Sequence, residues 1–271
     1  MQPDFSVVQF GRVDDYQGNP CYRQAMSLAS FCHCRDLLGL TNMEIVVVDW
    51  GSASPLQEAL TKILGGELKG IRWLQVPRDH APTGRINASL AHNVGIRRAV
   101  GRHIYYTLGD TLMIPSCWAI LEKVVLHEVF PYEPLFLVPR LHFPCELVDK
   151  GASPYTLIGM ATDWVLRKDG QERDNVRIFF GGLAGWVLKR ELWHQARGLD
   201  ESSDRNDNEF GCRVAPFCPP VDLGEFGCWG VHMDHPVTPW PERRELSLGH
   251  SLEANDENWG LGSVELQETQ C

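Results

Sequence analysis

The most restrictive feature of the sequence is an uninterrupted run of β-branched residues, Ile45–Val48, inside the segment MEIVVVDW. A strand with one face in water alternates apolar and polar residues, whereas a strand covered on both faces is apolar throughout. The run therefore predicts a buried strand over Met43–Trp50 in a mostly parallel sheet with helices on both sides. Asp49 lies at its carboxyl end, the edge at which open α/β sheets bind ligands.

The segments around this strand alternate between extended and helical patterns, which predicts a doubly wound α/β fold. Further strands are expected over Phe5–Phe10, Ile71–Val76, His103–Thr107, Leu135–Val138 and Ile178–Trp186. Helices are expected over Tyr22–Leu38, Pro55–Leu64, Ile86–Val100, Ser116–His127, Lys189–Ala196 and Asp204–Val214, with a short one around Ala161–Leu166.

Composition narrows the class of protein. The 271 residues are enough for one large α/β domain or two small ones. The net charge of −10 argues against nucleic-acid binding, because no basic excess exists to neutralise phosphates. No apolar run approaches membrane-spanning length, and the N-terminus lacks a signal-peptide pattern, so we expect a cytoplasmic protein without an integral membrane segment.

The nine cysteines give little support to a zinc site or a disulfide framework, because their number is odd and no CxxC pair occurs. The triplet Cys32-His33-Cys34 lies in a helical pattern, where adjacent side chains point to different faces. We interpret it as structural.

A second acidic residue, Asp110, follows the strand predicted over His103–Thr107. A carboxylate at that edge is a hard oxygen ligand, which suits Mg²⁺ or Mn²⁺ carrying a diphosphate. Gly109-Asp110-Thr111 is also ordinary turn chemistry, and on these residues alone a turn is the favoured interpretation.

Three segments in series resemble family 2 glycosyltransferases. They are MEIVVVDWGS, the segment Asn93–Pro115 (NVGIRRAVGRHIYYTLGDTLMIP) and the segment Phe180–Val214, and their order and spacing agree with the family from Phe5 to about Val214. The chain is thus similar to GT-A-fold glycosyltransferases. The resemblance implies a single domain over 1–271, with a nucleotide-sugar-binding half (1–115), an acceptor and catalytic half (116–235) and a partly mobile C-terminal tail (236–271).

The resemblance also implies roles for three acids. Asp49 matches the residue that contacts the nucleoside of the donor, and Asp110 matches the last Asp of the DxD metal motif, whose first Asp is replaced by Leu108. Asp207 matches the general base that takes the proton of the acceptor hydroxyl in inverting members. Its usual Glu neighbour is Asn206 here.

Other candidate residues concern the two substrates. Gly181 and Gly182 match the loop that frames the acceptor. Arg85 is expected to pair with phosphate or base of the donor, because a guanidinium grips phosphate bidentately, or else to lie at the surface. Trp186 is expected either to stack on an acceptor sugar or to lie in the core.

The segment VHMDH supplies candidate metal ligands beyond the base helix. Several GT-A enzymes take a third ligand from a histidine in this region, which makes His232 and His235 candidates beside Asp110, and imidazole suits Mn²⁺. Asp234 is an alternative ligand. If neither histidine binds a metal, we expect one of them to be hydrogen-bonded within the fold and the other to be solvated.

We therefore expect an inverting, hexosyltransferase-type enzyme that uses Mn²⁺ or Mg²⁺. It would move a sugar from a UDP- or GDP-type donor to a hydroxyl of a glycan or another acceptor. Two alternatives stay open: a catalytically silent nucleotide- or sugar-binding protein on the same fold, and a nucleotidyltransferase. The second normally has a basic, Gly-rich loop after its first strand, whereas Gly11–Pro20 is acidic.

Overall fold

The computed structural model describes residues 2–14, 20–66, 68–81, 86–144, 148, 152–167, 183–202, 206–235 and 254–270. The first half alternates strands and helices, as predicted. Its elements are β1 (Phe5–Gly11), α1 (Pro20–Leu37), β2 (Met43–Trp50), α2 (Leu56–Leu64), β3 (Ile71–Val76), α3 (Ala88–Arg98), β4 (His103–Thr107), β5 (Thr111–Leu112) and α4 (Pro115–His127).

The second half is less regular. Its elements are β6 (Leu135–Phe143), α5 (Pro154–Arg167), β7 (Leu183–Lys189), α7 (Arg190–Gln195), α8 (Asn206–Val214), β8 (Pro220–Asp222), the 3₁₀ helix η2 (Leu223–Phe226), β9 (Gly230–Met233) and β10 (Gln267–Gln270). No helix within the described ranges is both long and apolar enough to span a bilayer.

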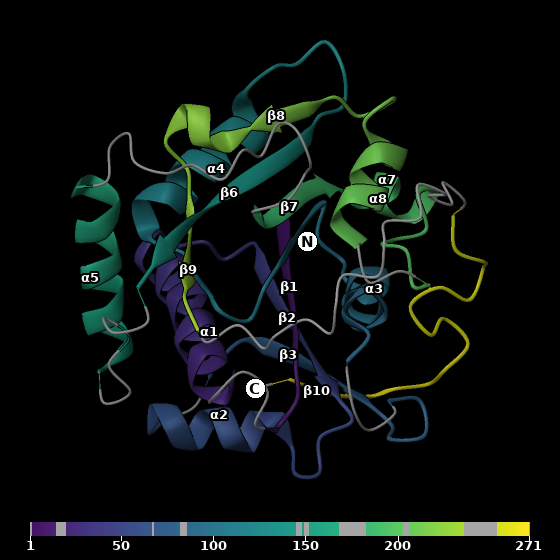
Figure 1. Ribbon diagram of the computed structural model, residues 1–271, viewed down its shortest axis with the longest axis horizontal. Helices are drawn as coiled ribbons and strands as arrows, with labels where there is room; N and C mark the ends of the chain where they lie inside the picture. The colour runs from purple at the N-terminus through teal and green to yellow at the C-terminus, as the bar shows by residue number, and fades with distance from the viewer. Residues whose placement is uncertain are drawn as a thin grey trace, which may run out of the picture.

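One mixed sheet organises the described strands, in the order β10-β3-β2-β1-β4-β7-β6-β9-β5, with β8 beside β6. β3, β2, β1 and β4 are parallel, while β7 runs antiparallel to both β4 and β6. Helices α1, α2, α4 and α5 lie on one side of the sheet, and α3, α7 and α8 on the other (Figure 1). The predicted α/β class, with helices flanking a central, mostly parallel sheet, is confirmed.

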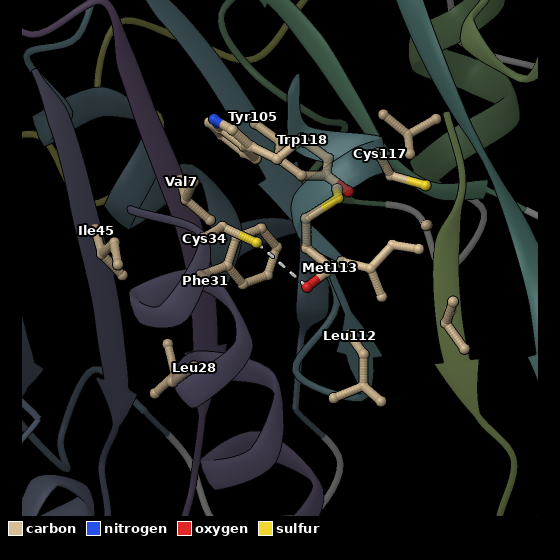
Figure 2. Close-up of a cluster of buried hydrophobic side chains, with 14 of the residues drawn as sticks. Val7, Leu28, Phe31, Cys34, Ile45, Tyr105, Leu112, Met113, Cys117 and Trp118 are labelled. Atoms are coloured by element: carbon tan, nitrogen blue, oxygen red, sulfur yellow. Dashed lines mark hydrogen bonds between the residues drawn. The ribbon is translucent and has the colours of Figure 1, made fainter. Parts of the chain in front are cut away.

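The apolar run of β2 is buried on both faces, as its sequence predicted. Ile45 and Val47 pack into the core on the α1 side, whereas Val46 and Val48 pack into the core on the α3 side. In the first of these cores, Phe31 and Cys34 of α1 pack among residues that include Tyr105 of β4 (Figure 2).

Two residues of the triplet Cys32-His33-Cys34, the cysteines, belong to or pack against this core. The Cys34 thiol is buried and contacts the carbonyl oxygen of Met113 at 3.4 Å (Figure 2). Burial raises the pKa of Cys32 to about 11 and raises the pKa of Cys34 further. Both thiols are therefore protonated at neutral pH, which supports the structural interpretation.

β6, α5 and β7 extend furthest beyond their predicted bounds. β6 continues to Phe143 instead of ending at Val138, because a register shift between Val138 and Pro139 accommodates the proline. α5 begins at Pro154, where Ser153 accepts a hydrogen bond from the amide of Thr156. β7 runs on to Lys189, past the predicted end at Trp186. Residues 178–182 of that predicted strand lie outside the described residues.

The C-terminal segment, expected to be partly mobile, contributes to the domain over 254–270. β10 pairs antiparallel with β3 at the edge of the sheet. Arg98 of α3 donates hydrogen bonds to the carbonyl oxygens of Gly260, Leu261 and Val264 at 2.7, 2.8 and 3.0 Å. This part of the tail therefore packs as an ordered layer on α3 and β3.

Candidate functional site

The pairing of three short strands brings the predicted metal ligands together. Asp110 lies in the turn between β4 and β5, and β5 pairs antiparallel with β9 so that Thr111 lies opposite His232. Nε2 of His232 and Nε2 of His235 each lie 3.3 Å from Oδ2 of Asp110. These three side chains therefore form one cluster, defined here as the Asp110 cluster.

The electrostatics of this cluster favour an ionised carboxylate. Burial by itself would raise the pKa of Asp110, but the charge and hydrogen bond of His232, followed by those of His235, outweigh it. The pKa of Asp110 therefore lies well below its usual range. The side chains of Asp110, His232 and His235 are 20%, 9% and 11% exposed, so the three groups lie in a partly desolvated setting.

The Asp110 cluster fits a divalent cation. Its carboxylate oxygen and two imidazole nitrogens all lie within 4.8 Å of one another. Ligands of an octahedral ion at about 2.1 Å lie about 3 Å apart, close to the 3.3 Å observed. Oδ1 of Asp110 is also buried, and none of the described residues hydrogen-bonds to it. A mixed nitrogen and oxygen donor set suits Mn²⁺ better than Mg²⁺, which prefers oxygen alone.

Asp234 lies on the other edge of the His232 ring. Its Oδ1 is 3.0 Å from Nδ1 of His232 and 2.7 Å from Nδ1 of His142. Burial raises the pKa of Asp234, but the hydrogen bonds from His142 and His232 outweigh that effect and lower it. Asp234, predicted as an alternative ligand, therefore contacts His232 and does not belong to the Asp110 cluster.

Asp49 shapes the loop at the carboxyl end of β2. Its side chain is buried, with Oδ1 accepting a hydrogen bond from the amide of Ser52 at 3.1 Å and Oδ2 one from the amide of Leu56 at 2.9 Å. Leu56 is the first residue of α2, so the carboxylate ties the strand end to the start of this helix. Its contact with a nucleoside stays a prediction.

The remaining predicted residues fall into two groups. Arg85, Gly181 and Gly182 lie outside the described residues. Asp207 is the second residue of α8, and only its backbone is described. A helix N-terminus stabilises negative charge, so this position suits an ionised carboxylate.

Trp186 lies in the core. It is fully buried, and its ring centroid is 4.9 Å from that of Phe210 and 5.7 Å from that of Tyr106. With no exposed surface, the indole is not available to stack on a sugar. The prediction of an acceptor contact at Trp186 is therefore corrected to a packing role.

One charged residue near the cluster has no signal in the sequence. Arg23 of α1 is 8% exposed, and burial lowers its pKa while the charge of nearby Asp110 raises it. A single arginine in an amphipathic helix looks like any surface cation until the fold places it. His142 was missed for a similar reason, since only the pairing of β6 with β9 brings it opposite His232.

Comparison with known proteins identifies the fold. No protein-family model and no curated protein sequence matches the chain. Among solved structures, it is similar to mannosyltransferase PcManGT from Pyrobaculum calidifontis in complex with GDP-Man and Mn²⁺, at 14% identity and a TM-score of 0.50. That match covers 86% of this chain and 57% of the other.

Two further structures give the same result. S. aureus TarS 1-349 matches at 13% identity and a TM-score of 0.50, covering 85% of this chain and 58% of that one. The catalytic domain of Drosophila beta1,4galactosyltransferase 7, in complex with xylobiose, matches at 12% identity and a TM-score of 0.51. That match covers 92% of this chain and 82% of the other. The chain thus spans less than two thirds of the first two proteins, and it has the GT-A fold.

Proposed function

We propose that the chain is a metal-dependent glycosyltransferase that moves a sugar from a UDP- or GDP-type donor to an acceptor hydroxyl. The observation that carries this proposal is the meeting of Asp110, His232 and His235 at the carboxyl edge of the sheet in a GT-A fold. PcManGT, which shares this fold, was solved with GDP-Man and Mn²⁺, which supports a nucleotide-sugar and a metal here.

The Asp110 cluster would hold Mn²⁺ or Mg²⁺, which would neutralise the diphosphate as it leaves the sugar. With Leu108 in place of the first acid of the motif, Asp110 is the one carboxylate of the cluster. A divalent cation held by one carboxylate and two neutral imidazoles keeps a net positive charge. The cluster would therefore attract the anionic donor more strongly than a site with two carboxylates.

Arg23 adds a second cation beside Asp110. A guanidinium is always charged and its planar fork matches phosphate oxygens, so it would bind the diphosphate from the α1 side. Arg85 would bind the same group or the base. Asp49 would position the loop after β2 against the nucleoside.

Asp207 would act as the general base. Its place at the start of α8 favours the ionised form, which takes the proton of the acceptor hydroxyl as that oxygen attacks the anomeric carbon. Attack from the face opposite the diphosphate inverts the configuration of the sugar. Gly181 and Gly182 would frame the acceptor, and a hexose is the sugar that we propose.

The test is thermal unfolding of the full chain with Mn²⁺ and a panel of UDP-, GDP- and dTDP-sugars. A ligand that binds only the folded state raises Tm, so one nucleotide should raise it in the presence of Mn²⁺ and not in its absence. Asp110→Ala should abolish the shift. Asp79→Ala, which removes an exposed carboxylate, should leave it unchanged.

A silent binding protein on the same fold is the second candidate, because Leu108 and Asn206 depart from the family pattern. Both candidates predict the Tm shift, and hydrolysis of the donor separates them. Slow Mn²⁺-dependent release of sugar that is lost in Asp207→Asn supports the transferase. Binding without any release supports the silent protein, and no shift with any nucleotide overturns both.

A further inference from the structure

Two overlapping groups of metal-ligating side chains share His232. One is the Asp110 cluster, and the other consists of His142, His232 and Asp234. They use different nitrogens of the shared ring: Nε2 faces Asp110, whereas Nδ1 faces Asp234. A neutral imidazole has one N–H and one lone pair, so only one of these nitrogens can bind a cation while the other keeps its proton.

The geometry on the Asp234 side is that of satisfied hydrogen bonds. Oδ1 of Asp234 lies 2.7 Å from Nδ1 of His142 and 3.0 Å from Nδ1 of His232, both ordinary lengths for N–H donors to a carboxylate. On the Asp110 side, the contacts to the two histidines are longer, at 3.3 Å, and Oδ1 is a buried acceptor to which no described residue donates. The side that needs a cation is therefore that of Asp110.

The backbone holds Asp234 in this place. β6 and β9 are parallel with His142 opposite His232, and the amide of Asp234 donates to the carbonyl oxygen of Phe143 at 2.9 Å. The indole N–H of Trp164 donates to the carbonyl oxygen of His142 at 2.9 Å. The carboxylate thus stands at the end of a paired strand, within reach of both rings.

We propose that Asp234 is a positioning residue for the metal centre: it accepts the Nδ1 proton of His232 and so directs the Nε2 lone pair toward the cation. His142 holds Asp234 in that orientation through the second hydrogen bond. This inference rests on the proposed function, because it needs the Asp110 cluster to bind a metal. Carboxylates that orient ligand histidines in this way typically contribute about 10- to 100-fold to metal affinity.

The experiment is calorimetric titration of Mn²⁺ alone into the metal-free full chain. Asp234→Ala should bind Mn²⁺ about 10- to 100-fold more weakly than wild type. Asp234→Asn, whose amide oxygen can still accept the Nδ1 proton, should recover part of the loss. Asp110→Ala should lose Mn²⁺ binding. The matched control is Asp79→Ala, which removes an exposed carboxylate that belongs to neither group of metal-ligating side chains.

Nitrogen NMR of the chain loaded with Zn²⁺, a diamagnetic probe, gives a readout that a general loss of packing would not move. Wild type should show two histidines, His232 and His235, each with a metal-bound Nε2 and a protonated Nδ1. In Asp234→Ala, His232 should lose this single tautomer while His235 keeps it. If Asp234→Ala does not fold, Asp234→Asn and His142→Phe carry the same test. Each of these variants should then bind Mn²⁺ more weakly than Asp79→Ala.

The outcomes separate this inference from the proposed function. No Mn²⁺ binding by wild type overturns the metal dependence and this inference with it. Equal affinity and an unchanged nitrogen signature in the Asp234 variants overturn the positioning role and leave the proposed function in place. Retained binding in Asp110→Ala with loss in Asp234→Ala would place the ion between His142 and Asp234, which also overturns it.

Discussion

At the scale of single residues, the unusual feature of the site is a guanidinium beside a carboxylate that is proposed to bind a cation. The charge of Asp110 raises the pKa of Arg23, so the two charges interact. The same positive charge repels a divalent cation and attracts a diphosphate, so Arg23 should influence the two ligands in opposite directions.

Replacing Arg23 with Gln tests this opposition. Mn²⁺ alone should bind to Arg23→Gln as tightly as to wild type or more tightly, because a like charge has been removed. In the presence of Mn²⁺, the nucleoside diphosphate should bind about tenfold more weakly, because a charge-assisted hydrogen bond is lost. Calorimetric titration of each ligand measures the two affinities. If Arg23→Gln weakens the binding of both Mn²⁺ and the nucleoside diphosphate, Arg23 only maintains the fold.

A buried histidine gives a second prediction at this scale, concerning pH. His92 is 1% exposed, with its ring nitrogens 3.0 Å from the carbonyl oxygen of Ala88 and 3.2 Å from that of Thr107. Burial lowers its pKa from 6.5 to about 4, and the two backbone hydrogen bonds oppose this shift only in part. The folded protein therefore keeps His92 neutral where the unfolded chain is protonated.

The sign of the pH dependence follows. Neutral His92 contributes to the free energy of unfolding in full above pH 6.5, because neither state then binds the proton. As the pH falls from 6.5 towards 4, the unfolded chain binds the proton and the folded protein does not, so the free energy of unfolding falls by at most about 3 kcal/mol. Urea unfolding at pH 7, 5.5 and 4.5 measures it, with His92→Gln as the comparison. The free energy of unfolding should fall less steeply in His92→Gln, and equal slopes would contradict the assignment.

At the scale of elements, what the sequence could predict depended on the length and apolar content of each strand. β2, β3 and β4 were predicted to the residue, because each is a compact apolar or β-branched run between turns. β8, β9 and β10 were not predicted, because they have three or four residues each and lie among Pro, Gly and polar residues. Short strands are defined by their partners, and a sequence pattern does not contain that information.

The site shows the same division. Asp110, His232 and His235 were predicted as metal ligands from a resemblance to motifs, and the fold does bring them together. His142 was missed because its position opposite His232 depends on the pairing of β6 with β9. Arg23 was missed because its interaction with Asp110 depends on how α1 packs on the sheet. Trp186 was predicted either as a sugar contact or as a core residue, and it lies in the core because β7 is buried on both faces.

The tight packing of β9 supplies a prediction for this scale. A Cβ at Gly230 would lie 2.2 Å from Cβ of Ala184 and 2.9 Å from Cγ2 of Thr111, whereas one at Gly66 meets nothing within 4 Å. Gly230→Ala should therefore displace β9, lower the free energy of unfolding by about 1–3 kcal/mol and weaken Mn²⁺ binding, because His232 moves with the strand.

Gly66→Ala is the matched control, since it adds the same methyl group in open space. Urea unfolding and Mn²⁺ titration of both variants make the measurement. Wild-type metal affinity in a destabilised Gly230→Ala would show that the position of β9 does not set the geometry of the Asp110 cluster.

At the scale of the whole molecule, the C-terminal segment 254–270 packs back onto β3 and α3 of the first half of the chain. β10 covers the edge of β3, which would otherwise present unpaired backbone groups, and Arg72 of β3 contacts Glu268 at 3.0 Å. Arg98 and Arg97 of α3 donate to carbonyl oxygens across 257–264. The proposed metal ligands lie elsewhere, Asp110 in the turn between β4 and β5, His232 on β9 and His235 just after β9, so the segment should act on stability and leave the site unchanged.

Arg98→Met separates these two roles, because methionine keeps most of the apolar stem and removes the guanidinium. Three carbonyl acceptors of 260–264 lose their partner, so the free energy of unfolding should fall by about 2–4 kcal/mol.

The control is Arg102→Met, at a side chain that is 55% exposed and paired with Asp4, which should lower the free energy of unfolding by about 1 kcal/mol or less. Folded Arg98→Met should still bind Mn²⁺ with wild-type affinity, because residues 254–270 pack on β3 and α3. If Arg98→Met is as stable as Arg102→Met, the tail does not stabilise the domain. If it loses Mn²⁺ affinity while folded, the tail acts on the site through α3 and the sheet.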